Sequence, residues 1–244
     1  MMGRCAYSQQ NLFNVPSATI TDQHEVFFQE QLNLGAFGES NLTIDYGLGN
    51  NWEVGLNVFK VNLYPGVVAP RPGEANNDAV LINLQKVFEI QDNLLIELGM
   101  QNGLSANNSQ QQVDVLNFSW LVTRYTAPEP RWGSYLIGVY HGTDSYLGRG
   151  NNMGYMLGTE IPLVGDDLSF VGDYISGDNG ASVAVVGLQW TVSRKHGWQI
   201  SFGGQLPSPG SGNSYGAVFE LTKYPPSFGR SPKAAIATNR WLRP

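Results

Sequence analysis

The sequence predicts an all-β fold, a transmembrane antiparallel up-and-down β-barrel of about 12 strands. Three observations predict it: the hydrophobic period, the length of the strands, and the alternation of short and long connections. Charged residues make up only 14% of the 244 residues although the hydrophobic share is 42%, and average soluble domains carry about 25% charged residues. Glycine, asparagine, glutamine and serine replace the charge, which is typical of a surface that faces something other than water.

Polar and apolar residues alternate with a period of two, which is the period of a β-strand. The alternation is strict over residues 41–48 and returns in residues 52–58, 198–203 and 215–222. No apolar stretch approaches the roughly 18 residues that a membrane-spanning helix needs. The pattern predicts strands at residues 24–35, 40–48, 52–63, 78–89, 93–103, 113–125, 132–141, 152–163, 168–176, 182–193, 198–206 and 214–224.

The lengths of these strands and of their connections favour a membrane barrel. Most predicted strands exceed the 5–6 residues typical of soluble proteins and match the roughly 9–11 residues of a tilted membrane-spanning strand. Connections after even-numbered strands are short and those after most odd-numbered strands are longer, with the first hairpin, at residues 36–39, as the exception. Bacterial barrels place short turns on the periplasmic side and long loops outside. Both termini are therefore expected on the periplasmic side.

Aromatic residues fall near the two ends of the predicted strands, where amphipathic rings favour the headgroup level of a bilayer. A soluble β-sandwich whose strand ends carry aromatic residues is the alternative. Trp52, Trp132, Trp190 and Trp198 lie beside predicted short turns, and Tyr64, Tyr140, Tyr155, Tyr174 and Tyr215 lie toward predicted long loops.

With its alternating strands, such as residues 47–56 and 171–178, the chain resembles bacterial outer-membrane β-barrel proteins of the porin-like kind. The resemblance covers about residues 24–224 and assigns no specific family. It implies a location in the bacterial outer membrane, contact with the lipid bilayer and a channel function. The C-terminus departs from the pattern, because many such barrels end on an aromatic residue of the last strand and here about 20 residues follow it.

Three segments are expected: residues 1–23 as a leader remnant or periplasmic segment, residues 24–224 as the barrel, and residues 225–244 as a basic periplasmic tail. The small residues of Ala6-Tyr7-Ser8 fit a cleavage site, with an ordinary N-terminus as the alternative. The tail contains no acid, so it is predicted to plug the barrel or to dock a periplasmic partner, unless it is a solvated end. Residues 9–22 are a second candidate for folding inside. The bases of the tail are Arg230, Lys233, Arg240 and Arg243.

Acidic residues fall on the strand face that would point into the lumen, because charge on the lipid face of a barrel is costly. Asn117 and Ser119 are expected on the same inner face. Two interpretations stay open: the acids line a pore that prefers cations, or they are buried acceptors in an occluded barrel. Glu30 alternates with Phe28 and Leu32, so its carboxylate implies a bulge, another register or a protein neighbour. The six candidate lumen-lining acids are Asp45, Glu53, Glu97, Glu160, Asp173 and Glu220.

The predicted function is a porin-like channel for passive passage of small solutes or ions. The alternative is a non-conducting outer-membrane barrel that anchors or scaffolds a complex with a periplasmic or surface protein. A pI near 5.0 argues against nucleic-acid binding. Three histidines and the single Cys5 lack metal-ligand spacing, so no metal and no cofactor are expected.

An enzyme is not expected either. The best catalytic candidate combines His141 with Asp144, Ser145 and Asn151 or Asn152. It is only vaguely similar to the Ser-His-Asn set that some outer-membrane phospholipases place on neighbouring strands. Thr143 stands where a His-x-Ser spacing would require the serine. Ser145 would also lie in a loop, where a nucleophile is poorly preorganised.

Overall fold

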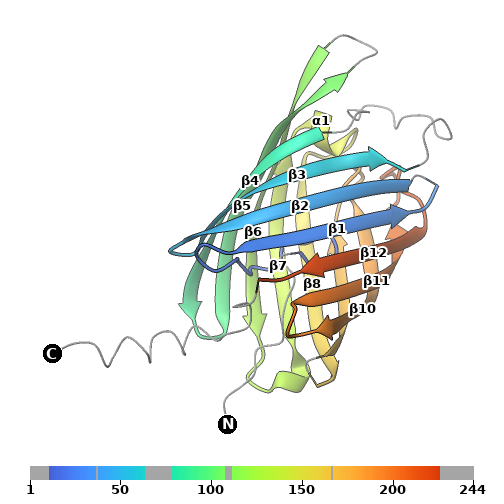
Figure 1. Cartoon of the computed structure of the whole chain (residues 1–244). Coiled ribbons are helices and arrows are strands. Elements are labelled where there is room, and N and C mark those ends of the chain that lie inside the picture. The colour runs from blue at the N-terminus through green and yellow to red at the C-terminus, as the bar shows by residue number, and fades with distance from the viewer. Residues whose placement is uncertain (1–10, 37, 64–78, 108–111, 166, 226–244) are drawn as a thin grey trace.

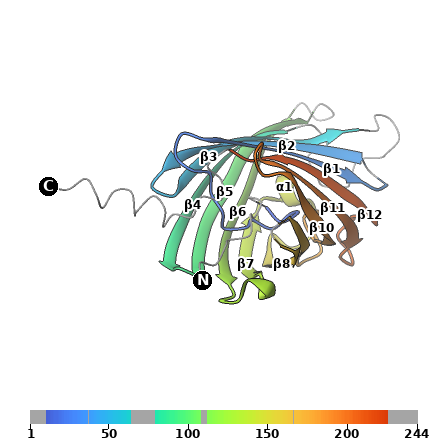
Figure 2. The ribbon, with the colours of Figure 1, turned by 60° about the horizontal axis from the view of Figure 1, so that its bottom comes forward.

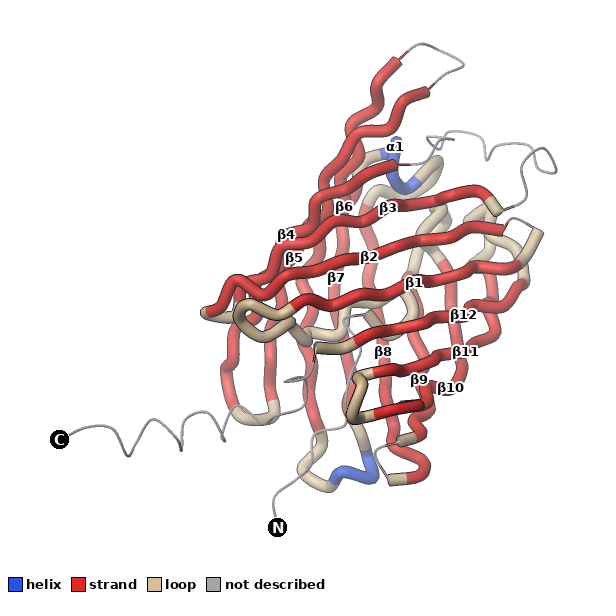
Figure 3. Tube along the Cα trace, viewed as in Figure 1, coloured by secondary structure: helices blue, strands red, loops and turns tan. Residues whose placement is uncertain are grey.

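The protein is a closed barrel of twelve antiparallel strands, each paired with its neighbours along the chain, with β1 also paired to β12 (Figures 1 and 3). The structure is a computed structural model that describes residues 11–36, 38–63, 79–107, 112–165 and 167–225. The fold class and the number of strands predicted from the sequence are confirmed. The strands are β1 (Val26–Leu34), β2 (Gly38–Gly49), β3 (Trp52–Asn62), β4 (Ala79–Gln91), β5 (Leu94–Asn107), β6 (Gln112–Thr126), β7 (Ser134–Gly142), β8 (Met153–Val164), β9 (Leu168–Ile175), β10 (Val183–Ser193), β11 (Trp198–Pro207) and β12 (Gly216–Lys223).

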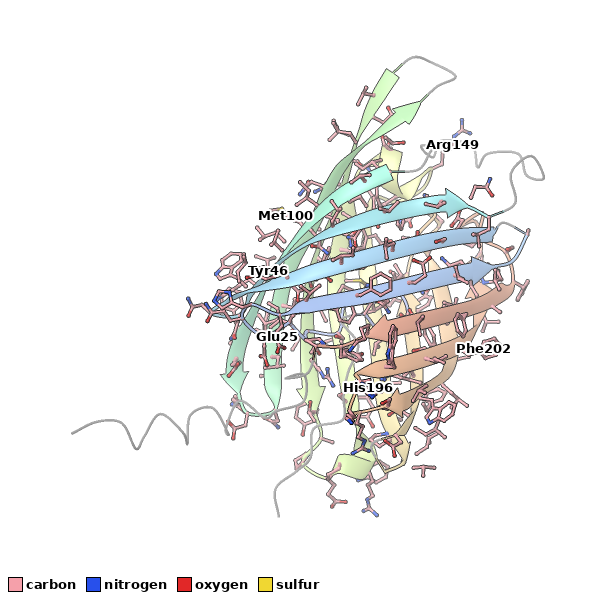
Figure 4. The ribbon with its side chains drawn as sticks, viewed as in Figure 1. Glu25, Tyr46, Met100, Arg149, His196 and Phe202 are labelled. Carbon is pink, nitrogen blue, oxygen red and sulfur yellow. The ribbon has the colours of Figure 1, made fainter. Side chains whose placement is uncertain are left out.

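Every second side chain of a strand points away from the interior. Many of these outward side chains are large and apolar, so the outer surface of the barrel is apolar. Burial alternates without exception along β7, and Tyr46, Met100 and Phe202 point outward in Figure 4. In the part of the chain that the structure describes, no helix is long and apolar enough to cross a membrane. The only α-helix there, α1 (Asp144–Leu147), is a single turn in the loop between β7 and β8.

The four tryptophans predicted beside short turns are all exposed, by 37% to 55%, as expected of a girdle of aromatic rings at the headgroup level of a bilayer. At the other end, Tyr155 and Tyr215 are exposed, whereas Tyr64 lies outside the described residues. Tyr140 was wrongly predicted to belong to this girdle. It is only 3% exposed and points inward, where its hydroxyl donates a 2.6 Å hydrogen bond to the carbonyl of Ser176.

The strands are unequal in length, so the two ends of the barrel differ. The hairpin of β5 and β6 extends beyond its neighbours at the end where α1 lies (Figure 1). β7 first pairs with β6 at Phe118 and Gly142, so residues 112–117 lie beyond the reach of β7. The short turns between strands lie at the opposite end (Figure 1).

The interior is filled by residues 11–21, here called the inner segment, which runs inside the strands (Figure 2). A tight turn at its start is closed by a hydrogen bond from the N–H of Leu12 to the carbonyl of Val15. Leu12, Phe13 and Val15 are at most 1% exposed and form the main apolar core with inward side chains of β6 to β10 and β12. At its end, Gln23 bridges to Gly47 near the short-turn rim.

The inner segment reverses the expected orientation of β6. Phe118 and Trp120 point inward and pack in the core, at 6% and 4% exposure. Asn117 and Ser119, predicted to face the lumen, therefore face outward. Asn117 donates a 2.7 Å hydrogen bond to Asn102 on the outer surface of β5. The physical reason is that part of the lumen is a hydrophobic core. The inward face of a strand can therefore be apolar there, as it is at Phe118 and Trp120 of β6.

Glu30 lies on the outer face in an unbroken register. It pairs with Leu42 of β2 and Leu221 of β12 without a bulge, and its carboxylate accepts a hydrogen bond from Ser40. The bulge and the alternative register considered for this position are thus ruled out.

Candidate functional site: the barrel interior and its outer vestibule

The six acids singled out in the sequence all lie on inward faces of the barrel wall and are buried. Their exposed fractions are 5% or less. They come from β2, β3, β5, β8, β9 and β12, so they are distributed around the wall rather than gathered in one ring. The hydrogen-bond partners of each carboxylate indicate whether it faces an open path or holds another part of the chain.

Asp173 on β9 holds the turn of the inner segment. Its Oδ2 atom accepts hydrogen bonds from the backbone N–H groups of residues 13–15, at 3.0, 2.5 and 2.9 Å. Three donors converging on one carboxylate oxygen form a charge-assisted anion nest, which is stronger than neutral hydrogen bonds. Asp173 thereby satisfies backbone groups that would otherwise be buried without partners.

Glu53 and Glu97 hold the later part of the same segment. Glu53 accepts a 2.7 Å hydrogen bond from the N–H of Thr21 and a 2.9 Å bond from Gln85. Glu97 accepts one from the backbone of Ala18 and a 2.6 Å bond from the indole of Trp120. Each carboxylate therefore joins the inner segment to a neighbouring strand.

Arg124 on β6 completes the attachment, and the sequence reasoning missed it. Its guanidinium donates to the carbonyl of Ser17 at 3.2 Å and to the hydroxyl of Thr19 at 3.0 Å. It also pairs with Glu160 at 3.4 Å, and both side chains are at most 9% exposed. The sequence does contain a sign of its role. If Asn117 and Ser119 faced the lumen, Arg124 would lie on the lipid face, where a charge is costly.

The remaining two acids are Asp45 and Glu220. Asp45 accepts a 2.7 Å hydrogen bond from Asn83 on β4. Glu220 is fully buried on β12. Four of the six acids, with Arg124, therefore act on the inner segment directly or through one ion pair.

Between the inner segment and the loop end of the barrel lies an open vestibule. It is open to solvent at the loop end, and its floor is the inner segment. Nine of its 25 lining residues carry side-chain amides and five carry aromatic rings. The lining includes Gln31, Asn33, Phe59, Lys60, Phe118 and Tyr146.

An aromatic stack closes one side of this vestibule. Tyr146 of α1 stacks on Phe59 of β3 and on Phe118 of β6, with ring centroids 5.2 Å apart in both pairs. A bulge beside Asn41 and a positive φ at Lys60 turn the Lys60 side chain toward the vestibule. Its ammonium group lies 5.3 Å from the centroid of Phe59. The single turn of α1 is what brings a loop tyrosine into the mouth of the barrel.

The hydrolase candidate is not assembled. His141 is exposed on the outer face at the end of β7, whereas Asp144 and Ser145 lie in α1. Asn151 donates its backbone N–H to Asp178 instead. Within the described ranges, no hydrogen bond joins these residues to one another, and no group of His, Cys, Asp or Glu has the placement of a metal site.

Several sequence predictions fall on residues outside the described ones. They are the cleavage-like Ala6-Tyr7-Ser8, Cys5, and the tail bases Arg230, Lys233, Arg240 and Arg243.

Comparison with known proteins identifies the type of barrel. No family model and no curated protein matches the sequence. Solved structures do: the KdgM porin aligns with a TM-score of 0.54 and 11% identity, over 82% of this chain and 98% of that chain. The chain has a porin-type barrel. A KdgM porin in complex with disordered oligogalacturonate aligns with a TM-score of 0.55 and 8% identity, and a NanC porin with 0.56 and 10%, at the same coverage.

These neighbours are outer-membrane porins, so the barrel is of the kind that occurs in the bacterial outer membrane. At identities of 8% to 11% the likeness concerns the fold. The chemistry of the interior has to be inferred from the residues of this chain.

Proposed function

We propose that this barrel is a porin-like channel of the bacterial outer membrane through which small solutes pass down their gradient. The observation that supports it most directly is the vestibule, a polar cavity that opens at the loop end of a closed barrel with an apolar exterior. A twelve-stranded barrel is wider than the eight-stranded kind that side chains fill completely. Its conducting path would run past the inner segment.

We further propose that the buried acids serve as anchors of the inner segment rather than as a cation-selecting ring. A selectivity ring concentrates cations when its carboxylates face water in the path. Here Asp173, Glu53 and Glu97 accept hydrogen bonds from the backbone of the inner segment, and Glu160 pairs with Arg124. The acids would thus hold the constriction, and selectivity would be decided in the vestibule.

The second candidate is a non-conducting barrel that scaffolds a protein complex. It is favoured by one observation, namely that the inner segment is packed in the main apolar core and held by hydrogen bonds at several points. An interior that is filled in this way can be closed to solutes. For the same reason, the proposed channel would have a low conductance.

Single-channel recording in planar bilayers separates the two candidates. The full chain is compared with one variant that lacks residues 11–21 and with another that lacks the tail, residues 225–244. We expect small conductance steps from the full chain, a several-fold larger conductance without residues 11–21, and no change without the tail. Heat-modifiable migration on gels verifies that each variant has folded. If the full chain and the variant without residues 11–21 both fold and neither conducts, the scaffold is the correct function.

The same experiment tests the tail. A rise in conductance only after removal of residues 225–244 would make the tail the plug, as the complementary charges of an acidic interior and a basic tail suggest. If removal of residues 11–21 prevents folding, Asp173→Leu takes its place, because it removes the acceptor of three backbone hydrogen bonds without shortening the chain.

A further inference from the structure

We propose that the vestibule binds uncharged polyhydroxylated ligands of the neutral oligosaccharide class. This inference rests on the proposed function, because the vestibule would be the outer mouth of the channel. Three properties of the cavity carry it: side-chain amides, aromatic rings that border the same space, and few charges among the described residues that line it.

The amide wall is built from the first strands and the inner segment. Gln31 and Asn33 on β1 are neighbours on the inward face, and Gln31 donates to Asn33 at 3.0 Å and to Asn14 of the inner segment at 3.5 Å. Both side chains are half-buried, so they retain surface toward the cavity. An amide group offers two donors and an acceptor with two lone pairs. Hydroxyl groups, which also donate and accept, are its natural complement.

The aromatic rings supply the apolar half of such a site. Phe59 and Tyr146 are half-buried, stacked within 9° of parallel, and border the same cavity as the amides. Phe118 also stacks on Tyr146, with ring centroids 5.2 Å apart. A saccharide ring has C–H groups on its faces and hydroxyls around its rim. Its faces would pack on the rings while its rim reaches the amides.

The charge of the cavity selects against ionic ligands. Glu39 and Lys60 are the only charged residues among the 25 that line it, and their charges are opposite. An acidic oligosaccharide would need several bases to compensate for desolvation of its carboxylates, and the described wall offers one.

Isothermal titration calorimetry on the full chain tests the proposal. The protein is kept in lauryldimethylamine oxide, because a glycoside detergent would itself compete for the site. Maltotetraose is the neutral probe, and tetragalacturonate is an acidic probe of the same length. We expect millimolar or tighter binding of maltotetraose and markedly weaker binding of tetragalacturonate. The inference fails if tetragalacturonate binds more tightly, or if maltotetraose does not bind.

Variants locate the binding. Asn33→Leu removes an amide from the wall and Phe59→Leu removes a ring from the stack, and each is expected to weaken maltotetraose binding about tenfold, since a ligand hydroxyl or apolar face loses its partner. Asn102→Leu is the control. It also replaces an asparagine by leucine, but on the outer surface of β5, so maltotetraose binding should not change. Equal binding by all three would overturn the inference even if the wild type binds.

Calorimetry does not depend on conduction, so the two proposals fail separately. Binding without conductance would contradict the channel and leave the saccharide site in place. Conductance without binding would leave the channel and remove the saccharide site.

Discussion

Arg124 combines a buried ion pair with hydrogen bonds to a backbone carbonyl and to two hydroxyl groups. Glu160 opposes its charge at 3.4 Å. Ser17 and Thr19 of the inner segment accept hydrogen bonds from one terminal nitrogen, and the hydroxyl of Ser134 accepts one from the other. A buried charge is stable only when it is paired and hydrogen-bonded. The inner segment is therefore part of what allows a base to lie inside this wall.

Removal of that base is the first prediction. Arg124→Met should lower the free energy of unfolding by about 3 kcal/mol, because it leaves the carboxylate of Glu160 buried without its ion-pair partner. Urea unfolding in micelles, followed by tryptophan fluorescence, measures the change. Arg131→Met is the control: its pair with Glu129 is 71% and 62% exposed, and such pairs contribute about 0–1 kcal/mol. Equal effects of the two variants would contradict the anchoring role of Arg124.

Gly99 gives a second prediction at this scale. A β-carbon at this position would lie 2.3 Å from the indole of Trp120, so the ring rests directly on the glycine backbone. Gly99→Ala should displace the indole, weaken its 2.6 Å hydrogen bond to Glu97 and cost about 1–3 kcal/mol of stability. Gly204→Ala on the outer face is the matched control, since nothing lies within 4 Å of its added carbon. A Gly99→Ala variant as stable as Gly204→Ala would refute the close packing.

At the scale of elements, the strands could be predicted from the sequence, whereas residues 9–22 were only one of two candidates for folding inside the barrel, beside the tail. Strand positions follow from the period of two and from turn residues, both local properties. The orientation of β6 depends on what fills the lumen. Phe118 and Trp120 are apolar and their neighbours Asn117 and Ser119 are polar, and the apolar pair points inward because it packs with the inner segment. The one local indication of this orientation is Arg124, which would be a charge on the lipid face if β6 were turned the other way.

The attachment of the inner segment yields a third prediction. Asp173→Asn should weaken the three hydrogen bonds to residues 13–15, because a neutral amide oxygen is a poorer acceptor than a carboxylate. Backbone amides of the inner segment should then exchange their hydrogens at least several-fold faster, while those of the barrel strands stay protected. Hydrogen exchange followed by mass spectrometry measures both. Asp167→Asn, in an exposed turn where Asp167 pairs with Arg194, should leave the exchange of the inner segment unchanged.

Considered as a whole, the molecule sorts its residues into three environments. Large apolar side chains cover the outside, a hydrophobic core and a set of anchored acids fill the middle, and amides with aromatic rings surround the vestibule. The low charge of the sequence follows from the first environment. The buried acids follow from the second, where each charge needs a donor from the inner segment or a neighbouring strand.

The last prediction tests the outer environment by depth. Ile137 in the middle of β7 and Val113 near the tip of the β5–β6 hairpin are equally exposed, at 61%. Ile137→Arg should cost about 2–4 kcal/mol of stability in liposomes, because it places a charge near the bilayer midplane, and Val113→Arg about 0–1 kcal/mol near or beyond the interface. A soluble barrel would show little difference between two exposed positions. Equal costs of the two variants in liposomes would therefore contradict a bilayer around β7. A large difference in cost that disappears in lipid-free solvent would place β7 in the membrane and the hairpin tip outside it.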